Sequence, residues 1–189
     1  MTLFSNYNLN EVLNKSLKNI NFTNPTPIQE KSIPLILQGK DILGSAQTGT
    51  GKTAAFCIPI LELLMKSPRG SLLIMIPTRE LAKQVLDVIN SLLGFKSSIN
   101  TATLIGGESM SKQLSELKKR PRIYVGTPGR INDHLQRGTL NLHDTKYLVL
   151  DETDRMLDMG FEVQINKIIK FLPVSKQVLM FSATIPNNI

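Results

Sequence analysis

The sequence predicts an α/β fold in which one open parallel sheet carries helices on both faces. Short apolar runs without polar alternation recur along the chain, and segments with helical apolar spacing lie between them. Continuous apolar runs are typical of parallel strands that are covered on both faces. The alternation of strands and helices implies right-handed crossovers, which place helices on both sides of the sheet. Because ligands of such sheets bind at the carboxyl ends of the strands, functional residues are expected there.

Six apolar runs are the predicted strands, and three segments between them are predicted helices. The clear strands are Ser71–Ile76, Arg122–Val125, Tyr147–Leu150 and Gln177–Phe181, and the shorter candidates are Asp41–Gly44 and Thr101–Ile105. Helical spacing relates Leu81, Val85, Val88, Ile89 and Leu92 in one segment, and Ile165, Ile168, Ile169 and Leu172 in another. The third helix is Lys52–Met65, where Pro59 is expected to cause a kink or to mark a boundary, because proline lacks the N–H that a helix interior requires.

Length and composition describe an ordinary globular protein. The 189 residues fit one domain or two very small ones, and 41% hydrophobic with 20% charged residues excludes a disordered chain. No apolar run reaches the roughly 18 residues of a transmembrane helix, so no membrane association is expected. The N-terminus lacks the basic and apolar segments of a secretory signal. The single cysteine, Cys57, cannot form an internal disulfide, and a cytoplasmic location is predicted.

The charge balance leaves a class of partners open. There are 22 Lys and Arg against 15 Asp and Glu, a formal net charge of +7. An excess of this size is compatible with nucleic acid or another anionic ligand, but many soluble proteins are also basic. Charge alone therefore does not decide the function.

The segment Ala46–Thr53, read as AQTGTGKT, indicates a phosphate-binding loop. It follows a short strand, opens a helix, and matches the pattern G-x-x-x-x-G-K-[ST] except for Ala46 in the first position. Gly49 and Gly51 allow backbone N–H groups to approach phosphate oxygens, and the helix directs its positive end at the same oxygens. Lys52 is expected to contact the β- and γ-phosphates, and the Thr53 hydroxyl to ligate Mg²⁺. The alternative is a Gly/Thr-rich turn that caps an ordinary helix.

An acidic pair at the end of another strand supplies the residues that hydrolysis of a bound nucleotide requires. Asp151 and Glu152 follow the apolar run Tyr147–Leu150. Asp151 is placed to hold Mg²⁺ through its water shell, and Glu152 to orient or deprotonate the attacking water. The alternative, an Asp-Glu pair that merely starts the next helix, loses weight beside a phosphate loop.

The chain resembles the N-terminal RecA-like P-loop NTPase domain of DEAD-box ATP-dependent RNA helicases. Seven signature blocks of that family occur in order and span nearly the whole chain. They are Asn21–Gln29 with the upstream Phe4 (Q motif), Ala46–Thr53 (motif I), Pro77–Leu81 (motif Ia), Gly106–Gly107 (GG), Thr127–Arg130 (motif Ib), Asp151–Asp154 (motif II) and Ser182–Thr184 (motif III). The resemblance divides the domain into a Q-motif region, 1–40, and the remainder, 41–189. It also implies that a second RecA-like domain, absent from this chain, follows where Ile189 stands.

Two residues depart from the family pattern. Thr153 replaces the alanine of the DEAD tetrad, and its extra hydroxyl and methyl are a possible disturbance of the packing against Ser182–Thr184. Asn21 replaces the usual glycine at the head of the Q motif, a mild change because asparagine also tolerates left-handed backbone geometry.

The resemblance implies a set of ATP contacts. By analogy Gln29 reads the adenine edge, Phe4 packs on the adenine ring and Thr26 supports the loop. An amide suits adenine because it can both accept and donate a hydrogen bond. The implied cofactors are ATP and Mg²⁺, with Thr53 and Asp151 on the metal and Lys52, Asp151 and Glu152 in catalysis. The implied nucleotide contacts are Phe4, Thr26, Gln29, Gln47, Thr48, Gly49, Thr50, Gly51, Lys52 and Thr53.

The resemblance also implies an RNA surface and a coupling segment. The RNA residues are Pro77, Thr78, Arg79, Gly107, Thr127 and Arg130, whose types suit a sugar–phosphate backbone and sequence-independent binding. Helix-start salt bridges are the alternative for the two arginines. Asp154 is expected to bond to motif III through Ser182 and Thr184 and so to couple nucleotide state to the domain interface. Arg155 is expected to be a structural ion-pair partner.

Other features have ordinary interpretations. Lys118–Arg120 and Arg122 form a basic cluster that we expect to face solvent. His134 and His143 lack partners at metal-ligand spacing, so no zinc site is predicted. Cys57 and the methionines at 65, 75 and 180 are expected in the core.

The predicted function is the ATP-binding half of a monomeric RNA helicase that couples ATP hydrolysis to RNA duplex unwinding or ribonucleoprotein remodelling. The isolated domain is expected to be nearly inactive. Two alternatives stay open: a P-loop DNA translocase, against which Phe4 and the Q motif argue, and a noncatalytic nucleotide- or RNA-binding module, which Thr153 favours.

Overall fold

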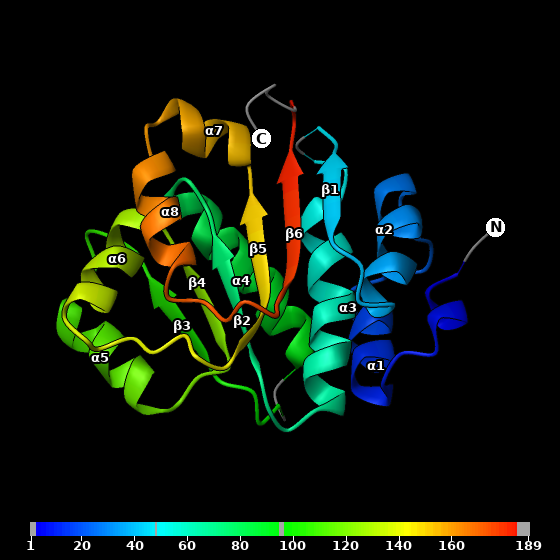
Figure 1. The fold of residues 1–189 in the computed structure, drawn as a ribbon. Helices are drawn as coiled ribbons and strands as arrows, with labels where there is room; N and C mark the ends of the chain where they lie inside the picture. Colours follow the sequence, from blue (N-terminus) through cyan, green and yellow to red (C-terminus); the bar gives the residue numbers. More distant parts are fainter. Residues whose placement is uncertain (1–2, 48, 95–96, 185–189) are drawn as a thin grey trace.

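The computed structural model describes residues 3–47, 49–94 and 97–184. Six strands form one sheet in the order β1-β6-β5-β2-β4-β3, and every neighbouring pair is parallel (Figure 1). The predicted open parallel sheet is therefore confirmed. The strands are β1 (Ile42–Ser45), β2 (Ser71–Met75), β3 (Thr101–Leu104), β4 (Ile123–Gly126), β5 (Thr145–Asp151) and β6 (Gln177–Ser182).

Helices cover both faces of this sheet. The helices are the 3₁₀ turn η1 (Phe4–Tyr7), α1 (Glu11–Asn19), α2 (Pro27–Leu37), α3 (Lys52–Lys66), α4 (Arg79–Leu93), α5 (Met110–Lys118), α6 (Pro128–Gln136), α7 (Thr153–Asp158) and α8 (Glu162–Ile169). Figure 1 shows α1, α2 and α3 on one side of the sheet and α5, α6 and α8 on the other.

Alternate residues of the central strands point into two separate cores. On β2, Leu72 and Ile74 pack with apolar residues of α1, α3 and α4, whereas Leu73 and Met75 pack with those of α6, α7 and α8. All five residues of β2 are buried. This double burial explains why the strands lack polar alternation in the sequence, because neither face of the sheet meets water.

The N-terminal segment packs onto the first of these cores. Phe4, Leu9, Leu13 and Leu17 are buried and belong to the same cluster as the residues of β2 and α3. The backbone N–H of Asn10 donates a hydrogen bond of 2.6 Å to Glu62 Oε2 on α3, which fixes the start of α1. The Q-motif region is thus held against the sheet-covering helix that follows the phosphate loop.

Pro59 neither ends nor divides the third predicted helix. Helix α3 runs without interruption from Lys52 to Lys66, so a boundary at this proline is wrong. The residues around it, Phe56, Cys57, Ile58 and Ile60, are fully buried. Burial of this apolar surface outweighs the one backbone hydrogen bond that proline removes.

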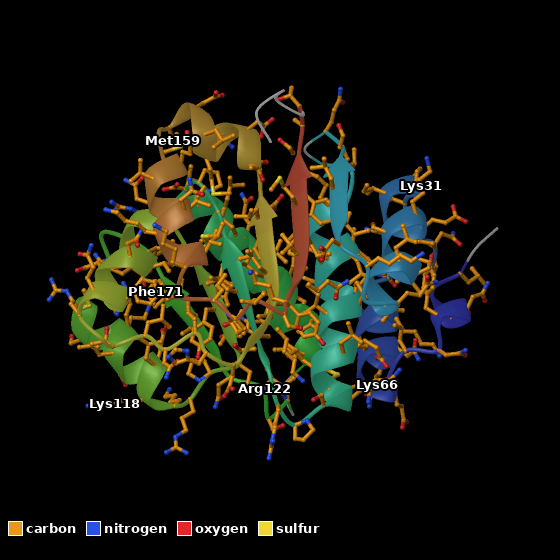
Figure 2. All side chains as sticks on the ribbon, viewed as in Figure 1. Lys31, Lys66, Lys118, Arg122, Met159 and Phe171 are labelled. Atoms are coloured by element: carbon orange, nitrogen blue, oxygen red, sulfur yellow. The ribbon has the colours of Figure 1, made fainter. Side chains whose placement is uncertain are left out.

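The carboxyl ends of the strands gather at one end of the sheet, as required by a fully parallel arrangement. Figure 2 places Met159 at this end of the molecule, and Lys118 and Arg122 at the opposite end. Within the described residues, no helix combines the length and the apolar character needed to cross a bilayer. The same residues contain no group of three His, Cys, Asp or Glu side chains suited to hold a metal.

Candidate functional site

The phosphate loop connects the edge strand β1 to the first turn of α3. The N–H of Ala46 donates to the carbonyl of Ser182 at 3.1 Å, which ties the start of the loop to the end of β6. The Thr50 hydroxyl donates to the carbonyl of Gln47 at 2.7 Å within the loop. Thr48, another predicted contact, lies outside the described residues. The predicted strand–loop–helix arrangement is present, with Lys52 as the first helical residue and Thr53 half-buried after it.

Two glycines have left-handed backbones that the loop requires. The φ angles of Gly49 and Gly51 are 86° and 90°. A Cβ on Gly51 would lie 2.4 Å from Gln29 Nε2, which is too close for any side chain. Gly51 is therefore needed for its backbone geometry and also for the approach of the Q motif.

Gln29 connects the Q motif to the phosphate loop. Its Nε2 donates to the carbonyl of Gly51 at 3.0 Å, and its Oε1 accepts from the N–H of Thr26 at 2.9 Å. The side chain is buried, and each of its two polar atoms keeps capacity for one further hydrogen bond. The structure thus assigns Gln29 a loop-supporting contact that the sequence did not predict, while recognition of adenine stays a prediction.

Phe4 lies in an aromatic group at the N-terminus. Its ring centroid is 6.1 Å from that of Phe22 in a stacked arrangement and 6.2 Å from that of Tyr7 in an edge contact. Only 3% of Phe4 is exposed. Its packing on a nucleotide base stays a prediction.

Lys52 is the clearest sign that the loop holds an anion. The side chain is buried, and its Nζ has no hydrogen-bond partner among the described residues. A buried ammonium without partners is costly unless a ligand supplies acceptors. Together with the glycine backbone and the amino end of α3, this arrangement fits the phosphates of a nucleotide.

Asp151 ends β5 and is buried close to the same lysine. The pKa of Asp151 is raised to about 6, chiefly by burial and also by the charges of Glu152 and Asp154, against the opposing Lys52 ammonium and Glu152 N–H. The N–H of Glu152 donates to Asp151 Oδ1 at 3.0 Å. Such a carboxylate is poised to gain from a cation, so Asp151 and the Thr53 hydroxyl fit the oxygen ligands that Mg²⁺ prefers.

Glu152 adopts a strained backbone at the junction of β5 and α7. Its φ angle is 54°, in the left-handed region that glutamate rarely occupies. Its Oε2 accepts a charge-assisted hydrogen bond of 2.6 Å from Arg155 Nη1, as expected for a structural arginine. The side chain is buried and is held in place beside Asp151.

Asp154 binds the end of β6 as the resemblance implied. Its Oδ2 accepts from the N–H and the hydroxyl of Thr184 at 2.9 and 3.0 Å, and its own N–H donates to Ser182 Oγ at 3.2 Å. Burial would raise the pKa of Asp154, but the hydrogen bonds from Thr184 and Ser182 outweigh it and hold that pKa below its usual value.

Thr153 fits between the two strands without displacing these contacts. Its hydroxyl lies 3.3 Å from the carbonyl of Leu150 and 3.4 Å from that of Phe181, and it is positioned to donate to either. The side chain is buried, so its polar atom is satisfied at the junction of β5 and β6. At the other departure from the family pattern, Asn21 has a φ of 58°, the left-handed geometry expected for it.

Five of the six predicted RNA residues border a pocket at the same end of the sheet, and the sixth, Gly107, follows the lining residue Gly106. This pocket, of about 530 Å³, is lined by Pro77, Thr78, Arg79, Gly106, Thr127 and Arg130, among others. Met159 and Phe161 form part of its wall as well. Neither residue was predicted to belong to this site, because nothing in their spacing relates them to the distant motifs.

Arg79 lies directly against the backbone of the GG segment. A Cβ on Gly107, whose φ is 74°, would come within 1.9 Å of Arg79 Nη1. Gly107 is therefore the residue that makes room for this guanidinium. Arg130, in the first turn of α6, is less free to bind a ligand, since its Nε lies 4.0 Å from Asp133 Oδ2 in the same helix.

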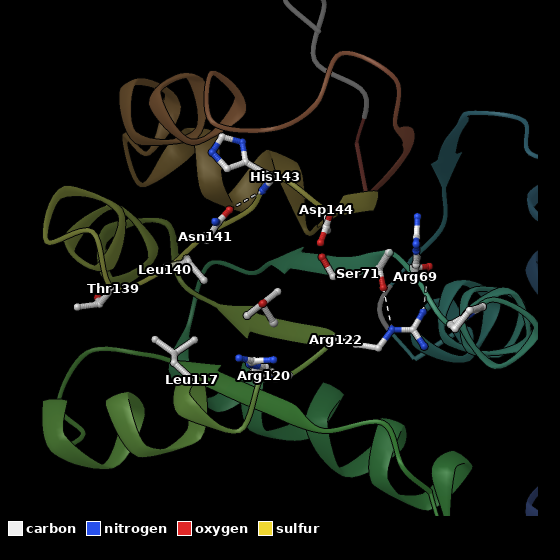
Figure 3. A pocket seen from close by; sticks show the side chains of 14 residues that line it. Arg69, Ser71, Leu117, Arg120, Arg122, Thr139, Leu140, Asn141, His143 and Asp144 are labelled. Atoms are coloured by element: carbon white, nitrogen blue, oxygen red, sulfur yellow. Dashed lines mark hydrogen bonds between the residues drawn. The ribbon is translucent and has the colours of Figure 1, made fainter.

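A cavity of about 570 Å³ at the amino ends of the strands is separate from these sites (Figure 3). Arg122, which borders it, was expected to face solvent, and this expectation is wrong. Its guanidinium donates to the carbonyls of Leu64, Ser67, Arg69 and Gly70 at 2.8–3.2 Å. Arg122 thus caps the end of α3 and fixes the turn into β2, a role that its sequence position beside other basic residues concealed.

Comparisons with known proteins agree with this geometry. Residues 26–189 match the DEAD/DEAH box helicase family. The chain is 49% identical to the ATP-dependent RNA helicase CshA of Listeria monocytogenes and 46% identical to the DEAD-box ATP-dependent RNA helicase RhpA of Helicobacter pylori. It aligns over 100% and 98% of its own length but spans only 36% and 38% of theirs.

A solved structure supports the same assignment. The fold superimposes with a TM-score of 0.93 on a DEAD box protein from the hyperthermophile Methanococcus jannaschii, at 44% identity. That match covers all of this chain and 52% of the other. With its phosphate loop, its acidic tetrad and its parallel RecA-like sheet in the family arrangement, the chain belongs to the DEAD/DEAH box helicase family.

Proposed function

We propose that the chain is the ATP-binding N-terminal part of an ATP-dependent RNA helicase that couples ATP hydrolysis to RNA duplex unwinding or ribonucleoprotein remodelling. The observation that carries this proposal is the buried Lys52 ammonium, which has no hydrogen-bond partner among the described residues. It lies near Asp151, at the end of the sheet that also holds the 530 Å³ pocket. A phosphate site and a surface of hydroxyls and guanidiniums, side by side on one sheet, suit an enzyme driven by a nucleotide that acts on a nucleic acid.

ATP is the proposed substrate of the phosphate loop. The backbone of residues 47–51 and the Lys52 ammonium hold the phosphates, and Gln29 keeps the loop in shape while offering its remaining hydrogen-bond capacity to adenine. Thr26 supports Gln29, and Phe4 closes the base side of the site. Thr53 and Asp151 hold Mg²⁺, which supplies charge neutralisation at the phosphate oxygens when it is bound.

Glu152 is the proposed base that orients or deprotonates the attacking water. The Arg155 ion pair and the strained backbone hold its carboxylate at the end of β5. Asp154 then connects this segment to Ser182 and Thr184. A shift of the Asp151 and Glu152 carboxylates in response to the nucleotide is thereby passed to the end of β6. Lys52, Asp151 and Glu152 carry the chemistry in this scheme.

RNA is the proposed partner of the 530 Å³ pocket. Pro77, Thr78, Arg79, Gly107, Thr127 and Arg130 present hydroxyls, backbone groups and guanidiniums, which suit phosphates and sugars in any sequence. A second RecA-like domain in the same protein supplies the opposite wall of both sites and an arginine finger. We further propose that the protein is monomeric and cytoplasmic, the latter because its one cysteine is a buried thiol.

The test is ATP hydrolysis by the complete protein with and without single-stranded RNA. We expect strong stimulation by RNA, at least about 100-fold slower turnover for Glu152→Gln, and nearly no turnover by the 189-residue chain alone. A complete protein that ignores RNA would overturn the proposal, and RNA-stimulated turnover by this chain alone would remove the need for a second domain.

The same assay separates the two alternatives. A DNA translocase would be stimulated by DNA in preference to RNA. A noncatalytic module would show no stimulated turnover, and Thr153→Ala would then be expected to restore it. Because the Thr153 hydroxyl is already accommodated, we expect Thr153→Ala to change turnover less than about twofold.

A further inference from the structure

A series of hydrogen bonds, buried at Gln113 and His134 and ending at the exposed Thr139, runs behind the proposed RNA surface. Gln113 on α5 and His134 on α6 are both completely buried. Gln113 Nε2 donates to the carbonyl of Ile105 at 2.9 Å, Gln113 Oε1 lies 3.0 Å from His134 Nε2, and His134 Nδ1 lies 2.8 Å from the Thr139 hydroxyl. From the sequence, His134 was predicted only to lack partners at metal-ligand spacing.

The donors and acceptors of this series can be assigned. Since Gln113 Nε2 donates to a carbonyl, its Oε1 faces His134 and can only accept, so His134 Nε2 carries a proton. In the neutral ring Nδ1 is an acceptor, so the single proton of the Thr139 hydroxyl is shared between Nδ1 at 2.8 Å and the His134 carbonyl at 3.1 Å. Burial lowers the pKa of His134, and the positive charge of Arg130 lowers it further against the opposing charge of Asp133.

Through Ile105 and His134, this series connects the two segments that border the RNA pocket. Ile105 immediately precedes Gly106 and Gly107, whose backbone contacts Arg79. His134 stands in the same helix as Arg130, whose first turn follows Thr127. Gln113 therefore bridges the segment after β3 and the helix α6 from the interior.

A second contact shows why this bridge controls the orientation of helix α6 relative to β3. The N–H of Thr127 donates to the carbonyl of Leu104 at 3.0 Å, and the neighbouring carbonyl of Ile105 anchors His134 through Gln113. Helix α6 is thus attached near both its ends to consecutive residues at the end of β3. Two attachment points fix the tilt of a helix relative to a strand, whereas one would leave it free to pivot.

We propose that Gln113 and His134 are positioning residues that set the distance between the Gly106–Gly107 segment and the Thr127–Arg130 turn, so that both contact one RNA backbone at the same time. The proposal rests on the RNA function proposed above. An apolar pair of similar volume would fill the same space but would lose the directional tie to the Ile105 carbonyl.

The test compares RNA binding by the complete protein and its variants Gln113→Met, His134→Phe and the double variant, with a non-hydrolysable ATP analogue present. Fluorescence anisotropy of a labelled oligouridine gives the affinity, and its dependence on salt gives the number of phosphate contacts. We expect each single variant to bind RNA about 5- to 20-fold more weakly, with the double variant no worse than either. The slope of log affinity against log salt concentration should fall by about one contact, while the affinity for the nucleotide is unchanged.

Leu172→Ala is the matched control, because Leu172 is buried in the same core but lies outside the hydrogen-bonded series. It should lower the melting temperature and leave RNA affinity and the salt slope unchanged. Gln113→Met and His134→Phe proteins that bind RNA like the parent, or an equal loss in Leu172→Ala, would overturn the inference alone. A parent protein that binds no RNA would overturn the proposed function, and this inference with it.

Discussion

The charged side chains at the two ends of the sheet are paired in opposite ways. At the carboxyl ends, the Lys52 ammonium lacks a hydrogen-bond partner among the described residues, and Asp151 has a pKa raised to about 6. At the amino ends, the Arg122 guanidinium donates to four carbonyls. The first end keeps polar capacity for a ligand, at a cost in stability, whereas at the second end four of the five N–H groups of Arg122 bind the protein's own carbonyls.

This difference distinguishes charged residues that bind a ligand from charged residues that stabilise the fold. A cation near an acid is ambiguous in the sequence, because both roles use the same residues. The hydrogen bonds in the structure distinguish the two roles. A charged group whose hydrogen bonds are made within the protein stabilises the fold, whereas a buried polar group without a partner is a candidate to bind a ligand. Substitutions at the two ends should therefore change stability in opposite directions.

The largest effect is expected at the amino end. Arg122→Ala leaves four carbonyls without their donor and unties the turn between α3 and β2, so the free energy of unfolding should fall by about 3–4 kcal/mol. Urea unfolding followed by circular dichroism measures this loss. Arg120→Ala, at an exposed neighbour in the same basic cluster, is the control and should change little. A loss below 1 kcal/mol for Arg122→Ala would make its contacts incidental.

A gain in stability is expected at the carboxyl end. The folded pKa of Asp151 lies above its unfolded value of 3.8, so the native state binds a proton more tightly and the ionised carboxylate lowers stability as pH rises from about 4 to 6. Asp151→Asn resembles the protonated form and should raise the free energy of unfolding by roughly 2 kcal/mol at pH 7.5. The gain should vanish at pH 4. Equal stabilities of variant and parent at pH 7.5 would show that the carboxylate is not strained.

The smallest effect on stability is expected at His134, a buried residue with hydrogen-bond partners that lies between the two ends of the sheet. Because its folded pKa lies below the unfolded value of 6.5, the native state binds fewer protons and stability falls as pH drops below about 6.5. His134→Gln cannot titrate, so the difference in melting temperature between parent and variant should shrink from pH 7.5 to pH 5.5. A difference that stays constant over this range would mean that His134 is not buried as a neutral ring.

Much of the fold followed from the sequence, because burial on both faces gives the strands short continuous apolar runs that alternate along the chain with segments of helical spacing. All six strands were predicted to within two residues at each end. Pro59 was misjudged since its local penalty is small beside the surface that α3 buries around it. Helix α1 was not predicted, because it has few apolar residues and these are buried only by packing against α4 and the first core.

The site was predictable where its residues form contiguous motifs at strand ends. Parallel topology alone brings the phosphate loop, Asp151 and Ser182 together. Contacts with main-chain carbonyls could not be predicted, since a carbonyl has no signature in the sequence. Arg122 with its four acceptors, Gln113 with Ile105, and Gln29 with Gly51 are all of this kind.

The central claim, that unsatisfied charge at the carboxyl end is the nucleotide site, is tested most directly by calorimetric titration of Mg·ATP into the 189-residue chain and its Lys52→Ala variant. The account predicts measurable binding by the parent and at least about 30-fold weaker binding by the variant, a loss near 2 kcal/mol or more. The melting temperature of the variant should stay close to that of the parent, because removal of an ammonium without a hydrogen-bond partner among the described residues offsets the loss of its attraction to Asp151. Equal affinities in a folded variant would place the nucleotide elsewhere and contradict the account.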